Sequence, residues 1–194
     1  YYIQAFPDMP SAATAFAKRA LAYEAMQNYD AAVSDLSTLL AKYPQARERE
    51  GTLQQKALIL GQQGNPKGMS DTFKQLLKEF PKSSVAAQAH FYIGKAAFEN
   101  KDFKGAIAAL NAARLANKEQ YYNPATVRII SSYYGLKDRA SVTREVDNFM
   151  ATSSNAQVPT DILEWLGTEY YNEKNYKAAE KYFSALGKIG NLQN

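Results

Sequence analysis

Apolar residues recur at spacings of three and four along most of the chain, and this spacing predicts amphipathic helices. Near the start of the chain, Phe16, Ala20 and Tyr23 fall on one helical face. A second apolar stripe follows and stops at Tyr43 and Pro44, because proline disfavours the helical conformation for the residue before it. No segment alternates between apolar and polar residues as a strand does, so the pattern predicts an all-α fold.

Small residues mark the chain at an almost constant interval of 37, 37, 37 and 36 residues: Ala20, Ala57, Gly94, Ser131 and Gly167. A constant period of this size indicates a repeat array. We therefore predict one array over residues 1–194, with helix pairs at roughly 11–44, 48–81, 85–118, 122–151 and 158–190. Residues 1–6 align with the end of a preceding repeat, so we expect the chain to be a fragment of a longer protein.

The small residues have a physical explanation. Gly94 and Gly167 lie in the middle of predicted helices, where glycine costs ~1 kcal/mol relative to alanine. Close approach of the second helix of the pair would offset this cost. Alanines twelve residues later, at Ala32, Ala106 and Ala179, are expected to supply the facing small residue.

Composition excludes several classes of protein. Hydrophobic residues make up 46% and charged residues 22% of the 194 residues, which is typical of a folded chain rather than a disordered one. The net charge of +4 is too small and too dispersed for a nucleic-acid surface. We therefore expect no nucleic-acid partner. No apolar run approaches the roughly 20 residues that span a bilayer, so we also expect no membrane insertion.

The chain offers few groups for chemistry. It contains no cysteine and a single histidine, His90, which has no second ligand of its own kind. Neither a phosphate-binding P-loop nor a Gly-x-Ser-x-Gly nucleophile motif is present. Glu169 and Glu173 lie one helical turn apart, a spacing that is typical of a solvated helix face. We expect no catalytic residues, no metal site and no cofactor, and hence no enzyme activity.

The recurring elements resemble the tetratricopeptide repeat. Each polar turn closed by an aromatic residue, as in Gln27-Asn28-Tyr29, lies between the two small positions, and a proline follows the second helix. The usual period of that family is about 34 residues, and the additional residues here lie mostly in the link after the proline. This longer link is similar to that of bacterial envelope members of the YbgF/CpoB and BamD types.

That resemblance implies an all-α, right-handed superhelical solenoid of antiparallel helix pairs in the bacterial cell envelope, either in the periplasm or at the outer membrane. In this family the first helix of each pair lines a concave groove that binds a protein or a peptide. The groove positions carry over to Leu58, Phe91, Lys95, Phe98, Arg128, Glu164 and Tyr171. We therefore expect a non-catalytic interaction scaffold, although Phe91 and Phe98 fit packing between helices equally well.

Two other functions stay open from the sequence. The chain is also compatible with a structural self-association module, in which Tyr1, Tyr2 and Ile3 pair with another copy. It is compatible, too, with the targeting arm of an enzyme encoded elsewhere in the full-length chain. The sequence does not give the oligomeric state.

Overall fold

The computed structural model describes residues 10–191, and this part of the chain is all-α, with ten helices and no strand, as predicted. The helices are α2 (Pro10–Ala25), α3 (Tyr29–Lys42), α4 (Arg49–Gln62), α5 (Pro66–Glu79), α6 (Ala86–Glu99), α7 (Phe103–Ala116), α8 (Lys118–Gly135), α9 (Arg139–Thr152), α10 (Thr160–Asn172) and α11 (Tyr176–Asn191). The predicted end of a preceding repeat at 1–6, with Tyr1, Tyr2 and Ile3, lies outside the described residues.

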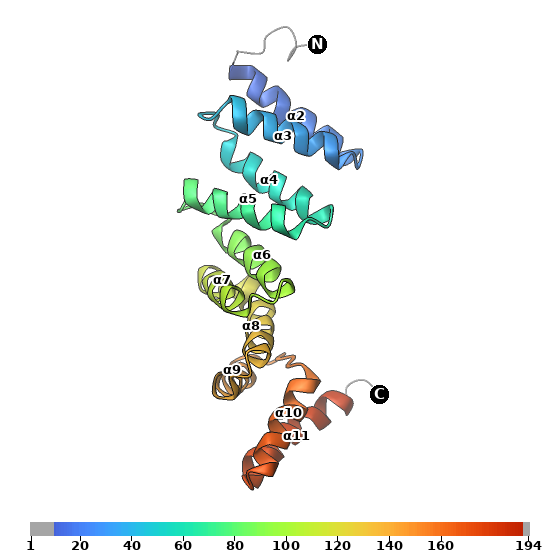
Figure 1. Ribbon diagram of the computed structural model, residues 1–194, viewed down its shortest axis with the longest axis vertical. Helices are drawn as coiled ribbons and strands as arrows, with labels where there is room; N and C mark the ends of the chain where they lie inside the picture. Colours follow the sequence, from blue (N-terminus) through green and yellow to red (C-terminus); the bar gives the residue numbers. More distant parts are fainter. Residues whose placement is uncertain (1–9, 192–194) are drawn as a thin grey trace. The chain divides into compact units, whose positions relative to one another are not determined.

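Helices joined by a tight turn lie side by side, as Figure 1 shows for α2 with α3 and for α10 with α11. The five tight turns share one backbone conformation. One residue in each has a positive φ of 57–73°: Gln27, Gly64, Lys101, Lys137 and Lys174. The following Asn or Asp then caps the second helix by accepting a hydrogen bond of 2.8–3.3 Å from a backbone N–H three residues later: Asn28, Asn65, Asp102, Asp138 and Asn175. A cap of this kind stabilises a helix by about 1 kcal/mol.

The described residues form two compact units that divide between Ala96 and Ala97. In the first unit the core continues from one helix pair into the next. Leu36 of α3 and Ile59 of α4 are fully buried in one cluster with Ala20. Phe73 of α5 is fully buried and stacks on Tyr92 of α6, with 5.7 Å between the ring centroids. Each of these second helices is thus covered by the first helix of the following pair.

The core of the second unit is centred on α9, α10 and α11. Val146 and Phe149 of α9 pack with Leu166 of α10 and Tyr182 of α11, and all four side chains are buried. These contacts attach the last described helix pair to α9.

A close contact occurs inside the last described helix pair, but its partner differs from the prediction: Ala179 was expected opposite Gly167, and the nearest side chain is that of Phe183. A Cβ added to Gly167 of α10 would lie 2.7 Å from the ring of Phe183 on α11, so the glycine is required for this approach. The contact inside the second helix pair differs, because Met69 lies twelve residues after Ala57, a position that holds alanine at Ala32, Ala106 and Ala179. A Cβ added to Gly61 would lie 2.7 Å from the Sδ of Met69, which is buried against α4.

Helix α8 begins at Lys118, four residues before the predicted fourth repeat, and only Asn117 separates it from α7. The side chain of Asn117 accepts a hydrogen bond of 3.1 Å from the backbone N–H of Gln120, which fixes this early start. Pro124 consequently lies inside the helix and removes one backbone hydrogen bond. The carbonyl of Pro124 accepts a hydrogen bond of 3.0 Å from Arg128.

Candidate functional site

Three exposed aromatic side chains lie on the last described helix pair, which is coloured orange to red in Figure 1. Tyr171 of α10 and Tyr176 of α11 are each 58% exposed, and Phe183 of α11 is 40% exposed. The rings of Tyr171 and Tyr176 meet edge to face, with 5.5 Å between their centroids. We refer to these three residues as the aromatic face. Exposed rings in one place are typical of a surface that binds another protein.

The local sequence fixes the geometry of the aromatic face. Gly167 lets the ring of Phe183 lie directly on α10. The turn at Lys174, with a φ of 61°, and the cap at Asn175 bring Tyr176 back against Tyr171. Tyr171 is one turn after Gly167 on α10, and Phe183 is two turns after Tyr176 on α11, so the three rings follow the seam between the two helices.

The buried side of this helix pair is anchored to α9. The hydroxyl of Tyr182 donates a hydrogen bond of 2.8 Å to Asp147, and its ring stacks on Tyr170 with 5.7 Å between the centroids. Burial, with the hydrogen bond to Asp147 next in importance, raises the pKa of Tyr182 far above its usual value. Tyr182 is therefore neutral over the physiological range, and the aromatic face rests on a fixed support.

Charged side chains border the aromatic face. Glu164 of α10 and Glu180 of α11 are exposed, as are Lys174 in the turn and Lys177 on α11. Lys177 makes no ion pair with another described residue. An apolar centre with a charged border is the usual composition of a protein-binding surface.

Of the predicted groove residues, three belong to the first unit. Leu58 is half-buried against the cluster around Leu53. Phe91 and Lys95 lie one turn apart on α6, both half-buried, and the ring of Phe91 meets Tyr92 edge to face with 5.8 Å between the centroids. All three residues are thus only partly accessible to a partner.

The other four predicted groove residues belong to the second unit. Phe98 is half-buried and packs on Phe103, with 5.9 Å between the ring centroids, and Arg128 is half-buried on α8. Glu164 and Tyr171 are exposed and lie two turns apart on one face of α10. The structure thus brings Glu164 and Tyr171 together on one surface, while the groove as a whole stays a prediction.

Sequence reasoning missed Tyr176 and Phe183, because the repeat pattern places the first in a turn and the second in a core. The repeat period relates Phe183 to equivalent residues of earlier helix pairs. Phe183 follows Gly167 by 16 residues, as Leu36 follows Ala20 and Phe73 follows Ala57. Leu36 and Phe73 are fully buried against the first helix of the following pair, whereas Phe183 is 40% exposed.

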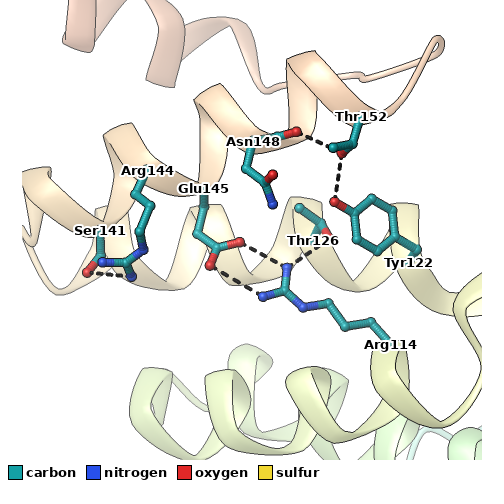
Figure 2. Close-up of polar contacts among 8 residues, drawn as sticks. All are labelled: Arg114, Tyr122, Thr126, Ser141, Arg144, Glu145, Asn148 and Thr152. Atoms are coloured by element: carbon teal, nitrogen blue, oxygen red, sulfur yellow. Dashed lines mark hydrogen bonds and ion pairs between the residues drawn. The ribbon is translucent and has the colours of Figure 1, made fainter.

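A polar cluster joins α7, α8 and α9, as Figure 2 shows. Arg114 of α7 donates two hydrogen bonds to Glu145 of α9, of 2.9 and 3.3 Å, and one of 3.2 Å to the buried Thr126 of α8. Arg114 and Glu145 are only 16% and 12% exposed. Because the protein itself engages these donors and acceptors, we interpret the cluster as a structural contact.

The remaining polar groups offer little for chemistry. His90 is half-buried, and burial lowers the pKa of its imidazole. Within residues 10–191, no three histidine, aspartate or glutamate side chains gather as a metal site would need. None of the helices in this part of the chain combines the length and apolar character that a bilayer crossing requires.

Comparison with solved structures identifies the fold. A structure described as the crystal structure of MamA protein has a TM-score of 0.69 at 17% identity, covering 92% of this chain and 91% of that chain. The structure of MamA 41-end from Desulfovibrio magneticus RS-1 has a TM-score of 0.66 at 15% identity, covering 94% and 97%. One described as MamA AMB-1 has a TM-score of 0.67 at 10% identity, covering 92% of both chains. Identities this low establish a common fold alone.

Comparison of sequences identifies the family. A search among curated proteins finds no significant match. Two family models described as tetratricopeptide repeat match residues 14–46 and residues 55–121, which together make up more than half of the chain. The expected resemblance is thereby confirmed: the chain belongs to the tetratricopeptide repeat family, an all-α class of protein-interaction scaffolds.

Proposed function

We propose that this chain is a non-catalytic scaffold that binds a protein or a peptide along the first helices of its pairs, within a bacterial envelope complex. The binding surface consists of Leu58, Phe91, Lys95, Phe98, Arg128, Glu164 and Tyr171. The observation that carries this proposal is the exposure of Tyr171, a residue that is 58% exposed although its ring packs edge to face on Tyr176.

Tyr171 has the properties of an interface anchor. Tyrosine and tryptophan supply much of the affinity of protein interfaces, because they bury a large apolar area at little cost in side-chain entropy. Glu164 lies two turns earlier on the same face of α10 and adds a charge at the border. A partner that covers Tyr171 therefore gains apolar contact at the centre and orientation from the surrounding charges.

The envelope setting rests on a separate argument. The period of 37 residues, with its longer link after the proline, is similar to that of envelope members of the family. A partner that resides in the envelope is the corresponding expectation.

Site-specific crosslinking tests the proposal. A photoreactive amino acid replaces Tyr171 in the protein within its native cells, and a matched variant carries it at Lys104, an exposed position on α7. We expect a protein adduct from position 171, found in the envelope fraction, and none from position 104. Equal adducts at both positions, or no adduct at 171, would refute binding at this surface, and an adduct found only in the cytosol would refute the envelope setting.

A further inference from the structure

One lysine of the first unit is half-buried without a counter-ion. Lys56 lies on α4, and three residues about one turn away on the same side of the helix, Thr52, Leu53 and Ile59, are buried. Lys56 makes no hydrogen bond or ion pair with another described residue. A charged amine in such a place loses part of its hydration and gains no partner in return.

The equivalent residue of the preceding helix pair shows what is missing. Lys56 directly precedes the small residue Ala57, as Arg19 directly precedes Ala20. Arg19 donates two hydrogen bonds of 2.6 Å to Asp35 of α3, whose side chain is only 8% exposed. The carboxylate of Asp35 thus balances the charge of Arg19 within that pair.

The pair formed by α4 and α5 lacks this carboxylate. One period after Asp35 the chain carries Thr72, which is buried on α5. The hydroxyl of Thr72 donates a hydrogen bond of 2.7 Å to a backbone carbonyl of its own helix, and that of Thr52 donates one of 2.8 Å to a backbone carbonyl. Neither hydroxyl carries a charge that balances the ammonium group of Lys56.

Later pairs show that the fold does not need an amine at this position. In the pair of α8 and α9 the two equivalent residues are Ile130 and Val146, and in the pair of α10 and α11 they are Leu166 and Tyr182. All four side chains are buried in one hydrophobic cluster. Packing alone is therefore sufficient at this position, and the amine of Lys56 is available for chemistry.

Burial changes the chemistry of this amine. It lowers the pKa of the Lys56 ammonium group, and no charged group among the described residues offsets the effect. A larger fraction of Lys56 is therefore neutral at a given pH than of an exposed lysine, and the neutral amine is the nucleophile. The opposite case is Lys67, because its hydrogen bond to Asp71 raises the pKa of Lys67 and favours the charged form.

We propose that Lys56 is an acylation site, at which the amine takes the acyl group of a small activated ester. The nitrogen attacks the carbonyl carbon, so that an N–C bond forms and the C–O bond of the ester breaks. The leaving oxygen takes the electron pair of that bond, and the proton of the amine passes to solvent. The product is an uncharged amide, so the acylated side chain no longer carries the cation that this position disfavours. This inference goes beyond the proposed function, because Lys56 does not belong to the proposed binding surface.

Acetylation of the 194-residue chain by 4-nitrophenyl acetate tests the inference. After a short reaction, the remaining amines are labelled with deuterated acetic anhydride under denaturing conditions, and mass spectrometry gives the acetylated fraction at each lysine. Lys104 is the internal reference, because it is exposed and makes no ion pair with another described residue. We expect Lys56 to react at least about threefold faster than Lys104. An equal or slower rate at Lys56 would overturn the inference.

A carboxylate placed beside Lys56 supplies the control. The variant Thr72→Asp gives Lys56 the counter-ion that Arg19 has in Asp35, and circular dichroism checks its fold. We expect the rate at Lys56 to fall at least about threefold and the rate at Lys104 to stay unchanged. An unchanged rate at Lys56 in the folded variant would contradict the role of the missing carboxylate.

The first pair allows the converse experiment, which also decides the matter if Thr72→Asp does not fold. Arg19→Lys places a lysine beside Asp35, and Arg19→Lys combined with Asp35→Thr leaves that lysine without a carboxylate. We expect position 19 to approach the rate of Lys56 only in the double variant. Equal rates at position 19 in the two variants would overturn the inference.

Discussion

The partly buried ion pair between Arg114 and Glu145 gives a quantitative prediction about the second unit. Arg114 reaches from α7 to Glu145 on α9 and touches Thr126 of α8 on the way, as Figure 2 shows. The change to make is Glu145→Gln, which keeps the size of the side chain and removes its charge. Arg114 then stays largely buried with its cation no longer balanced by Glu145.

The expected loss follows from the geometry. A hydrogen bond to a charged group contributes about 1.5–3 kcal/mol, and removing one partner of a fully buried pair costs about 3–5 kcal/mol. Arg114 and Glu145 retain 16% and 12% exposure, so solvent compensates part of the charge. We expect Glu145→Gln to lower the free energy of unfolding by about 2–3 kcal/mol. The double variant Arg114→Leu with Glu145→Leu should cost only about 1 kcal/mol, since no unpaired charge remains.

Urea unfolding followed by tryptophan fluorescence measures these losses. Trp165 is the single tryptophan, and it lies in the second unit on α10, so its emission reports on that unit. Arg144→Leu is a matched control, because Arg144 is exposed one residue before Glu145 and makes one long hydrogen bond of 3.3 Å to Ser141. We expect this control to change stability by less than about 0.5 kcal/mol.

Additive effects of the two single substitutions on the free energy of unfolding would refute this reasoning. If Glu145→Leu and Arg114→Leu each cost little, and their sum equals the cost of the double variant, the two charges do not interact appreciably. A coupling energy of about 2 kcal/mol is the outcome that the described geometry requires.

Three further predictions concern stability. Tyr182→Phe should cost about 1–2 kcal/mol at pH 7 by removing the hydrogen bond to Asp147. Because the pKa of Tyr182 is raised in the folded state, this contribution is fully present below about pH 10 and should fall as the pH rises above it. Urea unfolding between about pH 7 and pH 11 should therefore show the stabilities of the two proteins converging. Lys174→Gly should raise the thermal midpoint and stabilise by about 1 kcal/mol, because glycine adopts a φ of 61° without strain, and an unchanged midpoint would contradict this. A hydrogen bond from Arg49 lowers the pKa of Glu79. This carboxylate therefore stabilises the fold above its unfolded pKa, and the contribution is lost as the pH falls through the folded pKa. In acid titrations between about pH 6 and pH 2, the Glu79→Gln variant should lose less stability than wild type.

The sequence was sufficient to predict the helix pairs, because their signals are local. The spacing of apolar residues gives each helix, and the positions of small residues give the period. Gly167 shows both sides of this: its place in mid-helix predicts a close contact, but the predicted partner was Ala179, and the ring of Phe183 makes the nearest approach. The start of α8 at Lys118 lies before the fourth repeat as predicted from the period of 37 residues, although the Asn117 and Gln120 spacing is a recognisable cap signal.

The candidate site was only partly predictable, because exposure depends on neighbours that are distant in sequence. The resemblance places Tyr171 on a binding surface, and it is exposed. The spacing of Phe183 indicates a core position, yet its side chain is 40% exposed. The resemblance also places Phe98 in the groove, and its ring packs on Phe103 across the adjoining turn. Periodicity alone gives the side of a helix on which a residue lies and does not give what covers it.

The repeated turn has a consequence for how such a chain changes in length. A residue with positive φ and the Asn or Asp that follows it set each turn, as at Lys174 and Asn175, with no help from outside the pair. A whole module of one period can therefore be duplicated or deleted in frame while its hairpin geometry survives. Evolution can lengthen the protein in this way, and each rearrangement offers a new terminal module on which binding specificity can diversify.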